Sequence, residues 1–377
     1  MLNEIRENQP AQESKTKNGK TPLVWLLLDD RPGHATQVTG LAKRMKWTYV
    51  ALQLEFNFMN RIPNPLLGGS LVSLSRQGKA KLKPPFPDLV IGMGRRIVPV
   101  ARWIKRQSGG RSRIVLLGRK ALGNPAGIDL LVSCVHFNQL PRPGMFELVV
   151  PPTQVNAESL AAARLSRPNP MASLRKPPVV LLVGGPTAQH RFDPESAGRM
   201  ALQIAQATDE LSCGLAIVTS RRTPIKAVEA MRAAAPSAHI HVWQMANSDN
   251  PYLSYLANAD FLAVTGESES MIAEGSATGC PLTIYPLEAK PPGLKNGFAR
   301  VLRRVAEKRG IMAWLCRKIL MGGWIAPVRD VNLMHRAMQA QGLARLFDGS
   351  LNTHTPRPSN EFGLLADRLA ELLSGRS

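Results

Sequence analysis

Short apolar runs separated by turn residues recur along most of this chain. The first is Leu23–Leu28, which ends in the polar sequence Asp29-Asp30-Arg31-Pro32-Gly33-His34. A run of this length bounded by turn residues predicts a buried parallel strand that leads into a loop. The next stretch, Ala35–Met45, carries apolar residues at helical spacing, which predicts a helix.

The same strand, loop and helix unit repeats in two halves of the chain. Further apolar runs in the first half are Asp88–Ile91, Arg113–Gly118, Ile128–Ser133 and Glu147–Val150. Those in the second half are Val179–Val183, Leu215–Thr219, His239–Trp243, Phe261–Thr265 and Leu282–Tyr285. Strands that alternate with helices predict parallel sheets covered on both faces. We therefore expect an α/β fold of two doubly wound, Rossmann-like domains that face each other across a ligand-binding cleft.

Shifts in composition predict the domain boundaries. Residues 1–20 are polar and predict a disordered tail. The first domain is expected over residues 21–165, a linker rich in Pro, Arg and Ser over 166–178, and the second domain over 179–295. Residues 296–377 predict basic amphipathic and C-terminal helices.

The segment Phe298–Gly323 has an apolar stripe among many arginines and lysines, and Gly310 is expected to interrupt it. Two interpretations stay open at this point. The segment either lies on an anionic lipid surface or packs on the protein as an ordinary amphipathic helix.

The charge of the chain narrows the class of partner. Its 48 Lys and Arg exceed its 27 Asp and Glu, giving a formal net charge of +21, which favours an anionic partner. Only 5% of residues are aromatic, and no zinc-finger or RNP-like signature occurs, so nucleic acid is disfavoured. The remaining anionic partners are phospholipid headgroups and a phosphorylated or acidic substrate.

Cysteine usage and the N-terminus predict the compartment. The four cysteines are far apart and form no C-x-x-C pair, which predicts reduced, buried thiols. The first 20 residues lack the apolar region of a secretory signal, and no apolar stretch is long enough to span a bilayer. We expect a cytoplasmic protein, or one held peripherally on the cytosolic face of a membrane.

The strongest candidate site follows the strand at Phe261–Thr265 and opens a helix. Such a helix start presents unpaired N–H groups and a positive dipole end, which suit a phosphate. Ser268 or Ser270 is expected to cap the helix and bind a phosphate oxygen, and Glu274 to accept bonds from ribose hydroxyls. Glu267 and Glu269 complicate this prediction, since carboxylates facing inward repel a diphosphate. The alternative is an ordinary capped helix.

Two further turns of the second half are candidates. Gly184-Gly185-Pro186-Thr187 lets the backbone approach a ligand closely, or is simply a tight turn. Ser220-Arg221-Arg222-Thr223 offers forked phosphate donors, or is a solvated charge pair. All three turns are expected at one edge of one sheet.

In the first half, His34 on the first turn is the candidate general base. Asp30 either serves as the base itself or orients His34, and a structural or solvated histidine is the alternative. Arg95 and Arg96, after the strand at Asp88–Ile91, are expected to face the same cleft. Metal-ligand spacing is absent, so we expect no metal ion.

Several of these motifs together resemble the mitochondrial fission Elm-type family, whose bacterial members are described as glycosyltransferases. They are Gly33-His34 with Gln37, Ser220–Pro224, Tyr255–Asp260 and Thr265–Pro281. The resemblance covers roughly residues 22–330. This chain departs from the family pattern with Glu267 in place of aspartate and Gly275 in place of alanine.

That family in turn looks like the GT-B glycosyltransferases, notably the peptidoglycan N-acetylglucosaminyltransferase. The resemblance implies that His34 lies on the acceptor side. It also implies a set of residues that hold the nucleotide sugar, namely Gly184, Gly185, Gly266, Ser268, Ser270, Met271 and Glu274.

The favoured function is that of an inverting, metal-independent GT-B glycosyltransferase without a cofactor. Its donor substrate would be a nucleotide-diphosphate sugar, and its acceptor an anionic membrane-associated glycan or a lipid-linked sugar of the cell envelope. Two alternatives stay open. One is a non-enzymatic, membrane-associated scaffold of the fission type, and the other is a nucleotide-sugar epimerase of the same fold.

Overall fold

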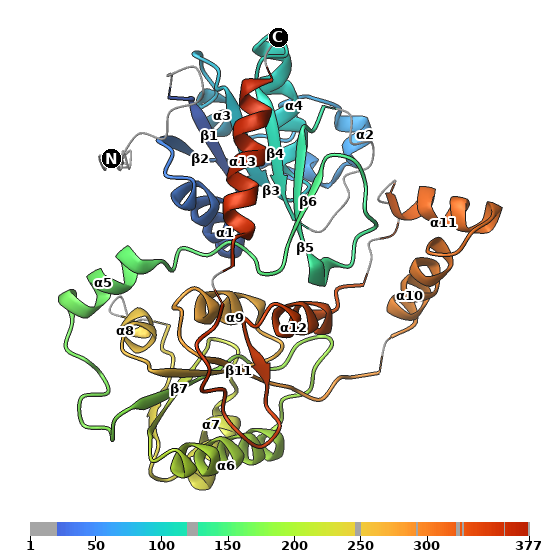
Figure 1. Ribbon diagram of the computed structural model, residues 1–377. Helices are drawn as coiled ribbons and strands as arrows, with labels where there is room; N and C mark the ends of the chain where they lie inside the picture. The colour runs from blue at the N-terminus through green and yellow to red at the C-terminus, as the bar shows by residue number, and fades with distance from the viewer. Residues whose placement is uncertain are drawn as a thin grey trace. The chain divides into compact units, whose positions relative to one another are not determined.

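The computed structural model describes residues 21–118, 127–245, 250–291, 293–321, 325, 328–357 and 359–375. The predicted tail, residues 1–20, lies outside the described residues. The chain folds into two compact units (Figure 1). One comprises the chain up to Leu148 with Asn296–Arg329 and Asn360–Ser377, and the other comprises Val149–Lys295 and Asp330–Ser359.

A six-stranded parallel sheet in the order β2-β1-β3-β4-β5-β6 forms the centre of the first unit. Its strands are β1 (Val24–Leu28), β2 (Tyr49–Gln53), β3 (Leu89–Met93), β4 (Arg113–Leu117), β5 (Leu130–Cys134) and β6 (Met145–Leu148). The order reverses between β1 and β3, and such a switch point is where doubly wound sheets bind ligands.

Helices cover both faces of this sheet. The two on one face are α1 (Pro32–Arg44) and the C-terminal helix α13 (Glu361–Ser374), and α4 (Ile97–Gln107) lies on the other (Figure 1). Arg44 lies over the Phe362 ring, 4.2 Å from its centroid, which fixes α13 against α1. Short elements fill the β2–β3 and β5–β6 connections: η1 (Phe58–Arg61), α2 (Asn64–Leu67), α3 (Arg76–Ala80) and η2 (Val135–Phe137).

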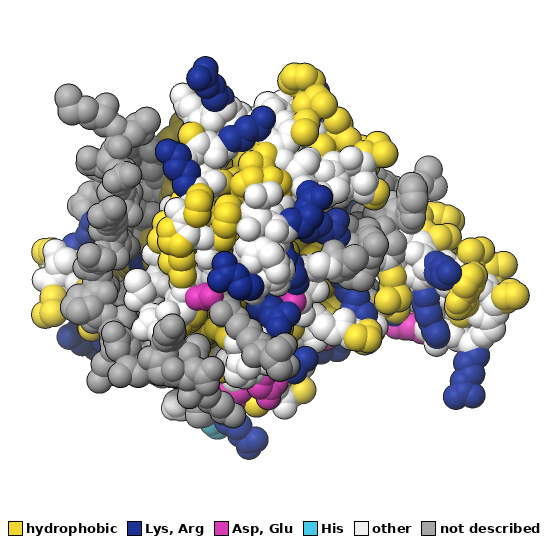
Figure 2. Space-filling view, turned by 90° about the horizontal axis from the view of Figure 1, so that it is seen from above, with side chains coloured by type: hydrophobic (Ala, Val, Ile, Leu, Met, Phe, Trp, Pro, Cys, Tyr) yellow, Lys and Arg dark blue, Asp and Glu magenta, His cyan; other side chains and the backbone are white. Residues whose placement is uncertain are grey.

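The first unit also contains a helical hairpin made of α10 (Leu294–Ala306) and α11 (Ile311–Met321). The expected interruption at Gly310 is confirmed, because this residue has a φ of +112°, in the left-handed region that favours glycine. Hydrophobic and basic side chains lie side by side on the outer surface of the hairpin (Figure 2). No helix within the described ranges is both long enough and apolar enough to cross a bilayer.

The second unit has its own six-stranded parallel sheet, ordered β12-β11-β10-β7-β8-β9. Its strands are β7 (Pro178–Val183), β8 (Gly214–Thr219), β9 (His239–His241), β10 (Phe261–Thr265), β11 (Leu282–Tyr285) and β12 (Arg345–Leu346). Numbered along the chain, this is the 3-2-1-4-5-6 order of the dinucleotide-binding Rossmann fold. The order reverses between β7 and β10. The predicted α/β fold of two Rossmann-like domains is thereby confirmed.

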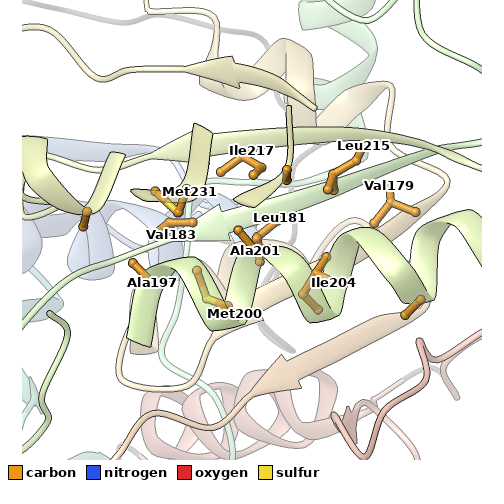
Figure 3. Close-up of a cluster of buried hydrophobic side chains, with 14 of the residues drawn as sticks. Val179, Leu181, Val183, Ala197, Met200, Ala201, Ile204, Leu215, Ile217 and Met231 are labelled. Atoms are coloured by element: carbon orange, nitrogen blue, oxygen red, sulfur yellow. The ribbon is translucent and has the colours of Figure 1, made fainter. Parts of the chain in front are cut away.

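Helices α6 (Pro194–Glu210) and α7 (Ile225–Ala234) lie on one face of this sheet, and α9 (Glu269–Ser276) and α12 (Val331–Ala340) on the other (Figure 1). The remaining helices are α5 (Ala157–Ser166) and α8 (Tyr252–Ala257). Alternate side chains of β7 and β8 pack with the inner face of α6 to form the main core (Figure 3).

The bounds of the two units differ from the predicted domain bounds at two places. Helix α5 belongs to the second unit, where Arg164 Nε donates to the Ala257 carbonyl at 2.6 Å. The C-terminal helices do not form a separate region, because α12 lies in the second unit and α10, α11 and α13 in the first. The packing of each helix, and not its proximity in the sequence, decides which unit it belongs to.

The β7–α6 core gives a stability prediction. Leu181 is fully buried between β7 and α6, so Leu181→Ala leaves a cavity and lowers the free energy of unfolding of its unit by about 2–5 kcal/mol. Leu202→Ala, on the exposed side of α6, serves as the control and changes it by less than about 0.5 kcal/mol. Urea unfolding followed by circular dichroism measures both, and equal effects would contradict the placement of this core.

Candidate functional site

The three predicted turns of the second unit lie at the carboxyl ends of β7, β8 and β10. We call them together the switch site, defined as residues 184–187, 220–223 and 265–274. The first turn is held by the third: the Gly184 amide donates to Thr265 Oγ1 at 2.9 Å, and the Gly185 amide donates to Glu267 Oε1 at 2.7 Å. The structure therefore brings these turns into contact.

Glu267 has its carboxylate in the middle of the switch site. Its side chain is fully buried, with Oε1 3.5 Å from Arg222 Nη2, and Oε2 is enclosed with no hydrogen-bond partner in the described part of the chain. Burial raises the pKa of this carboxyl group, and the Gly185 amide, the Thr265 hydroxyl and the Arg222 guanidinium offset the rise only in part. Of the two acidic residues, Glu267 is the more buried, and Glu269 is half-buried with its Oε1 enclosed as well.

Neighbouring atoms of the chain leave no room for a side chain at Gly184 or Gly185. A Cβ added to Gly184 would lie 1.8 Å from Glu267 Oε1, and one added to Gly185 would lie 2.3 Å from the Arg222 carbonyl oxygen. Any side chain at either position would displace Glu267 or the backbone of Arg222. The close approach at this turn is made by Glu267 and Arg222, and the expected approach of a ligand to these glycines stays a prediction.

In the turn after β8, the hydroxyl groups hold the first turn in place and one arginine contacts the third turn. Ser220 Oγ and Thr223 Oγ1 both donate to the Gly184 carbonyl, at 2.7 and 2.6 Å. Arg222 Nη2 lies 3.4 Å from Ser268 Oγ as well as near Glu267, and its side chain is 39% exposed. Arg221 is exposed as well, so the contacts of Arg222, and not burial, distinguish the two arginines of the motif.

Thr187, which ends the first turn, bonds within its own loop. Its hydroxyl accepts from the His190 amide at 3.0 Å and from the Gln189 amide at 3.2 Å. Lys290 Nζ donates to its carbonyl at 2.9 Å. This side chain thus closes a local turn, and its role in nucleotide binding stays a prediction.

The start of α9 differs from the expected capped helix. Ser268 occupies the N-cap position, yet its hydroxyl makes no capping bond and lies beside Arg222 instead. Ser270 is exposed on the first turn and Met271 is buried beneath it. The side chain at the N-cap position therefore does not cap α9, and a helix N-terminus of this kind can bind an anion.

Glu274 already has a hydrogen-bond partner. Tyr252 of α8 donates its hydroxyl to Glu274 Oε2 at 2.6 Å. Burial raises the pKa of Glu274, the bond from Tyr252 lowers it in part, and burial beside this carboxylate raises the pKa of Tyr252 well above its usual value. A ribose hydroxyl would share Glu274 with Tyr252, a residue that sequence reasoning missed.

A second residue missed by sequence reasoning is His335 of α12. It is buried, and its Nε2 lies 2.8 Å from the Gly266 carbonyl oxygen. A Cβ on Gly266 would lie 2.8 Å from the His335 ring, so Gly266 is required for this packing. The two residues are 69 positions apart, and no local pattern connects them.

In the first unit, His34 lies on the first turn of α1 beside the carboxyl end of β1. His34 Nδ1 is 3.0 Å from both carboxylate oxygens of the buried Asp29. Burial acts to raise the pKa of Asp29, but the hydrogen bond and charge of His34, with the amide and charge of Arg31, hold this pKa below its usual range. Since a carboxylate only accepts, Nδ1 carries the proton and neutral His34 has its lone pair on Nε2.

Asp30, the predicted partner of His34, points elsewhere. Its side chain is 71% exposed and pairs with Arg96 at 2.8 Å. Asp29, one residue earlier, therefore orients His34 in its place. An aspartate that directly ends a buried strand is the signal that could have identified it, since that position is the more buried of the two.

The turn after β3 meets His34 at the switch point of the first sheet. Gly94 has a φ of +85°, and a Cβ there would lie 2.9 Å from His34 Cε1. Arg95 does not serve as the expected ligand-facing cation, because its guanidinium donates to the carbonyls of Ile62, at 2.7 Å, and Asn60. Arg95 fixes the η1 loop instead. Among the described residues, no group of three or more His, Cys, Asp and Glu could hold a metal ion.

Comparison with known proteins gives a family match over most of the chain. The family model described as mitochondrial fission ELM1 matches residues 32–332. An uncharacterized protein of Rickettsia prowazekii (strain Madrid E) is 24% identical over 293 residues, which are 70% of this chain and 82% of the relative. The mitochondrial fission protein ELM1 of Arabidopsis thaliana is 30% identical over 138 residues, covering 35% of this chain and 30% of that protein.

Among solved structures, the UDP-GlcNAc 2-epimerase from Methanocaldococcus jannaschii is similar to this chain with a TM-score of 0.48 and 11% identity. The similarity covers 93% of this chain and 99% of the epimerase.

The raised pKa of Glu267 gives a pH prediction. The pKa of this carboxyl group is higher in the folded protein than its unfolded value of about 4.5. Such a group stabilises the folded state at pH values below about 4.5, and this stabilisation is lost as the pH rises through the folded pKa. Wild type should therefore lose stability relative to Glu267→Gln as the pH rises above about 4.5. Melting temperatures of both proteins across the pH range test this, with Glu210→Gln as an exposed control for the lost charge. A difference between wild type and Glu267→Gln that does not change with pH would contradict the prediction.

Proposed function

The chain belongs to the mitochondrial fission ELM1 family, as its motifs predicted, and we propose that it is an inverting glycosyltransferase using a nucleotide-diphosphate sugar. The observation that supports this proposal most strongly is the arrangement of hydrogen-bond donors in the switch site. Ligands of doubly wound sheets bind at the carboxyl ends of the strands where the order reverses. In the second unit this point lies between β7 and β10, where Gly185, Arg222 and the start of α9 come together.

These groups form a set of donors suited to a diphosphate. The Gly185 amide and the Arg222 guanidinium already bind a carboxylate, that of Glu267. The start of α9, where the Ser268 side chain makes no capping bond, adds backbone amides and the positive end of a helix dipole. We propose that the diphosphate replaces the Glu267 carboxylate on Gly185 and Arg222. The raised pKa of Glu267 favours its neutral form, which reduces its repulsion of the incoming anion.

The proposed reaction is a single displacement at the anomeric carbon of the sugar. His34 Nε2 accepts the proton of the acceptor hydroxyl, with Asp29 stabilising the imidazolium that forms. The acceptor oxygen bonds to the anomeric carbon as the bond from that carbon to the diphosphate breaks. Arg222 and the start of α9 then stabilise the leaving diphosphate, so that fixed donors carry its charge.

The acceptor is proposed to be a membrane-associated glycan or a lipid-linked sugar, reached from the cytosolic face of the membrane. The supporting observation is the net charge of +21, which favours an anionic surface or substrate.

One observation favours a second candidate, a non-enzymatic scaffold. Glu267 and Arg222 account for both glycines of the first turn without any ligand, and Glu267 occupies the donors that a phosphate would need. A chain that kept the fold and lost its chemistry could retain these contacts. Nucleotide binding separates the two candidates.

Nucleotide affinity tests the donor site, and Arg221 provides a matched control for Arg222. Isothermal titration with UDP, GDP, ADP and CMP should show binding to at least one nucleotide. Arg222→Ala should weaken that binding by about tenfold or more, because a charge-assisted bond is lost. Arg221→Ala, which removes the same charge from the neighbouring position, should have little effect, because Arg222 makes the contacts with Glu267 and Ser268. Absence of binding to all four nucleotides would favour the scaffold.

The proposed base is tested separately from the donor site. His34→Ala should abolish transfer and leave nucleotide affinity nearly unchanged, because His34 has no part in donor binding. Asp29→Asn should slow transfer by at least about 100-fold, whereas Asp30→Asn should have little effect. Turnover with a radiolabelled donor measures all three. Unchanged turnover in His34→Ala would remove this residue from the mechanism.

A further inference from the structure

The α10–α11 hairpin has a fixed interior and an apolar outer surface. Its buried face is a small cluster of Leu302, Ala306, Cys316 and Leu320, packed against Leu140 and other partly buried hydrophobic residues. Arg317 Nε donates to the Ala306 carbonyl at 2.6 Å, which joins the second helix to the end of the first. Arg303 Nε reaches the Asn138 carbonyl at 3.3 Å and ties the hairpin to the first unit. The hairpin is thus a defined structural element.

Large hydrophobic side chains project from the hairpin into solvent. They are Phe298, Val301, Ile311, Met312, Trp314 and Leu315. Ile311 is 84% exposed and Trp314 is 52% exposed. These residues are not needed to hold the two helices together, since the buried cluster does that. An exposed apolar group of this size on one element indicates a surface that binds a partner.

Basic side chains surround these hydrophobic residues. Residues 296–321 contain seven Lys and Arg and one acidic residue, Glu307, so their net charge is 7 − 1 = +6. Six of the basic residues are exposed: Arg300, Arg304, Lys308, Arg309, Arg317 and Lys318. Lys318 Nζ lies 4.2 Å from the centroid of the Trp314 ring. Hydrophobic and basic side chains are seen together on this hairpin in Figure 2.

The charge decides between the possible occupants of this surface. A second copy of the chain would bring two surfaces of the same sign together, which costs energy. An anionic bilayer meets both requirements, because headgroup phosphates attract the basic residues while the hydrophobic side chains enter the acyl boundary. Tryptophan beside lysine is also typical of the membrane–water interface.

We infer that the outer surface of the α10–α11 hairpin docks on a bilayer of anionic phospholipid. Ile311, Met312, Trp314 and Leu315 insert at the level of the headgroups, and the exposed basic residues contact the phosphates. The inference rests on the proposed function only in placing the enzyme near a membrane-associated acceptor. Lipid binding is measured without nucleotide, so its failure and the failure of glycosyl transfer are distinguishable.

Co-sedimentation of the full chain with vesicles tests the inference. Vesicles of phosphatidylcholine mixed with phosphatidylglycerol should bind the protein at least about tenfold more strongly than phosphatidylcholine alone, and added salt should weaken the binding. Lys308→Gln/Arg309→Gln should weaken it by about tenfold or more. Lys226→Gln/Arg232→Gln removes two exposed charges from α7 and should change it little, although the net charge is the same in both variants.

The hydrophobic contribution has its own variants and control. Ile311→Ser/Leu315→Ser should reduce binding by about tenfold or more, whereas Leu165→Ser/Ile225→Ser, at exposed sites in the second unit, should not. Anionic vesicles should shift tryptophan emission to the blue, and Trp314→Phe should lose most of that shift although five of the six tryptophans remain.

Three results would overturn the inference. The first is that the wild-type protein does not bind anionic vesicles. The second is that the control variants lose as much binding as the hairpin variants. The third is that sedimentation velocity shows a dimer of the wild type, which the hairpin variants abolish. In the last case the surface would bind a second copy of the chain.

Discussion

The Glu267 carboxylate accepts a hydrogen bond from the Gly185 amide at 2.7 Å, and it does so with its side chain fully out of water. A buried carboxylate needs donors close by, and this need explains its neighbours. Positions 184 and 185 must be glycine because Glu267 and the Arg222 backbone lie where side chains would be. Arg222, in the turn after β8, places its Nη2 3.5 Å from the same carboxylate. Glu267 therefore holds the three turns of the switch site close to one another.

The same interaction links the fold to the proposed chemistry. Donors that hold a carboxylate in a site with little water can also hold a phosphate, because both are anions with oxygen acceptors. The Rossmann strand order places these donors at the switch point between β7 and β10. His34 and Asp29 lie at the corresponding switch point of the first sheet, between β1 and β3. Each unit thus has polar side chains where its own strand order reverses.

Local pattern predicted most strands, because a buried parallel strand reads as a continuous apolar run. The runs at Phe261–Thr265 and Leu282–Tyr285 match β10 and β11. The strand β2 was missed because its side chains are mostly exposed or half-buried, and β12 because it has two residues. The site was harder to predict. Asp29, which meets His34, could have been identified from its place at the end of a buried strand. The packing of His335 on Gly266 depends on a tertiary contact that no local spacing encodes.

Amide hydrogen exchange with and without UDP tests the switch site most directly, because it reports on individual turns without requiring an acceptor. The account predicts that a saturating nucleotide slows exchange in the segments containing Gly184, Gly185 and residues 266–270, with smaller changes elsewhere in the second unit. Peptides covering the buried β7–α6 core serve as the internal reference. Protection confined to other segments, or unchanged exchange in these turns when the nucleotide is bound, would contradict the account.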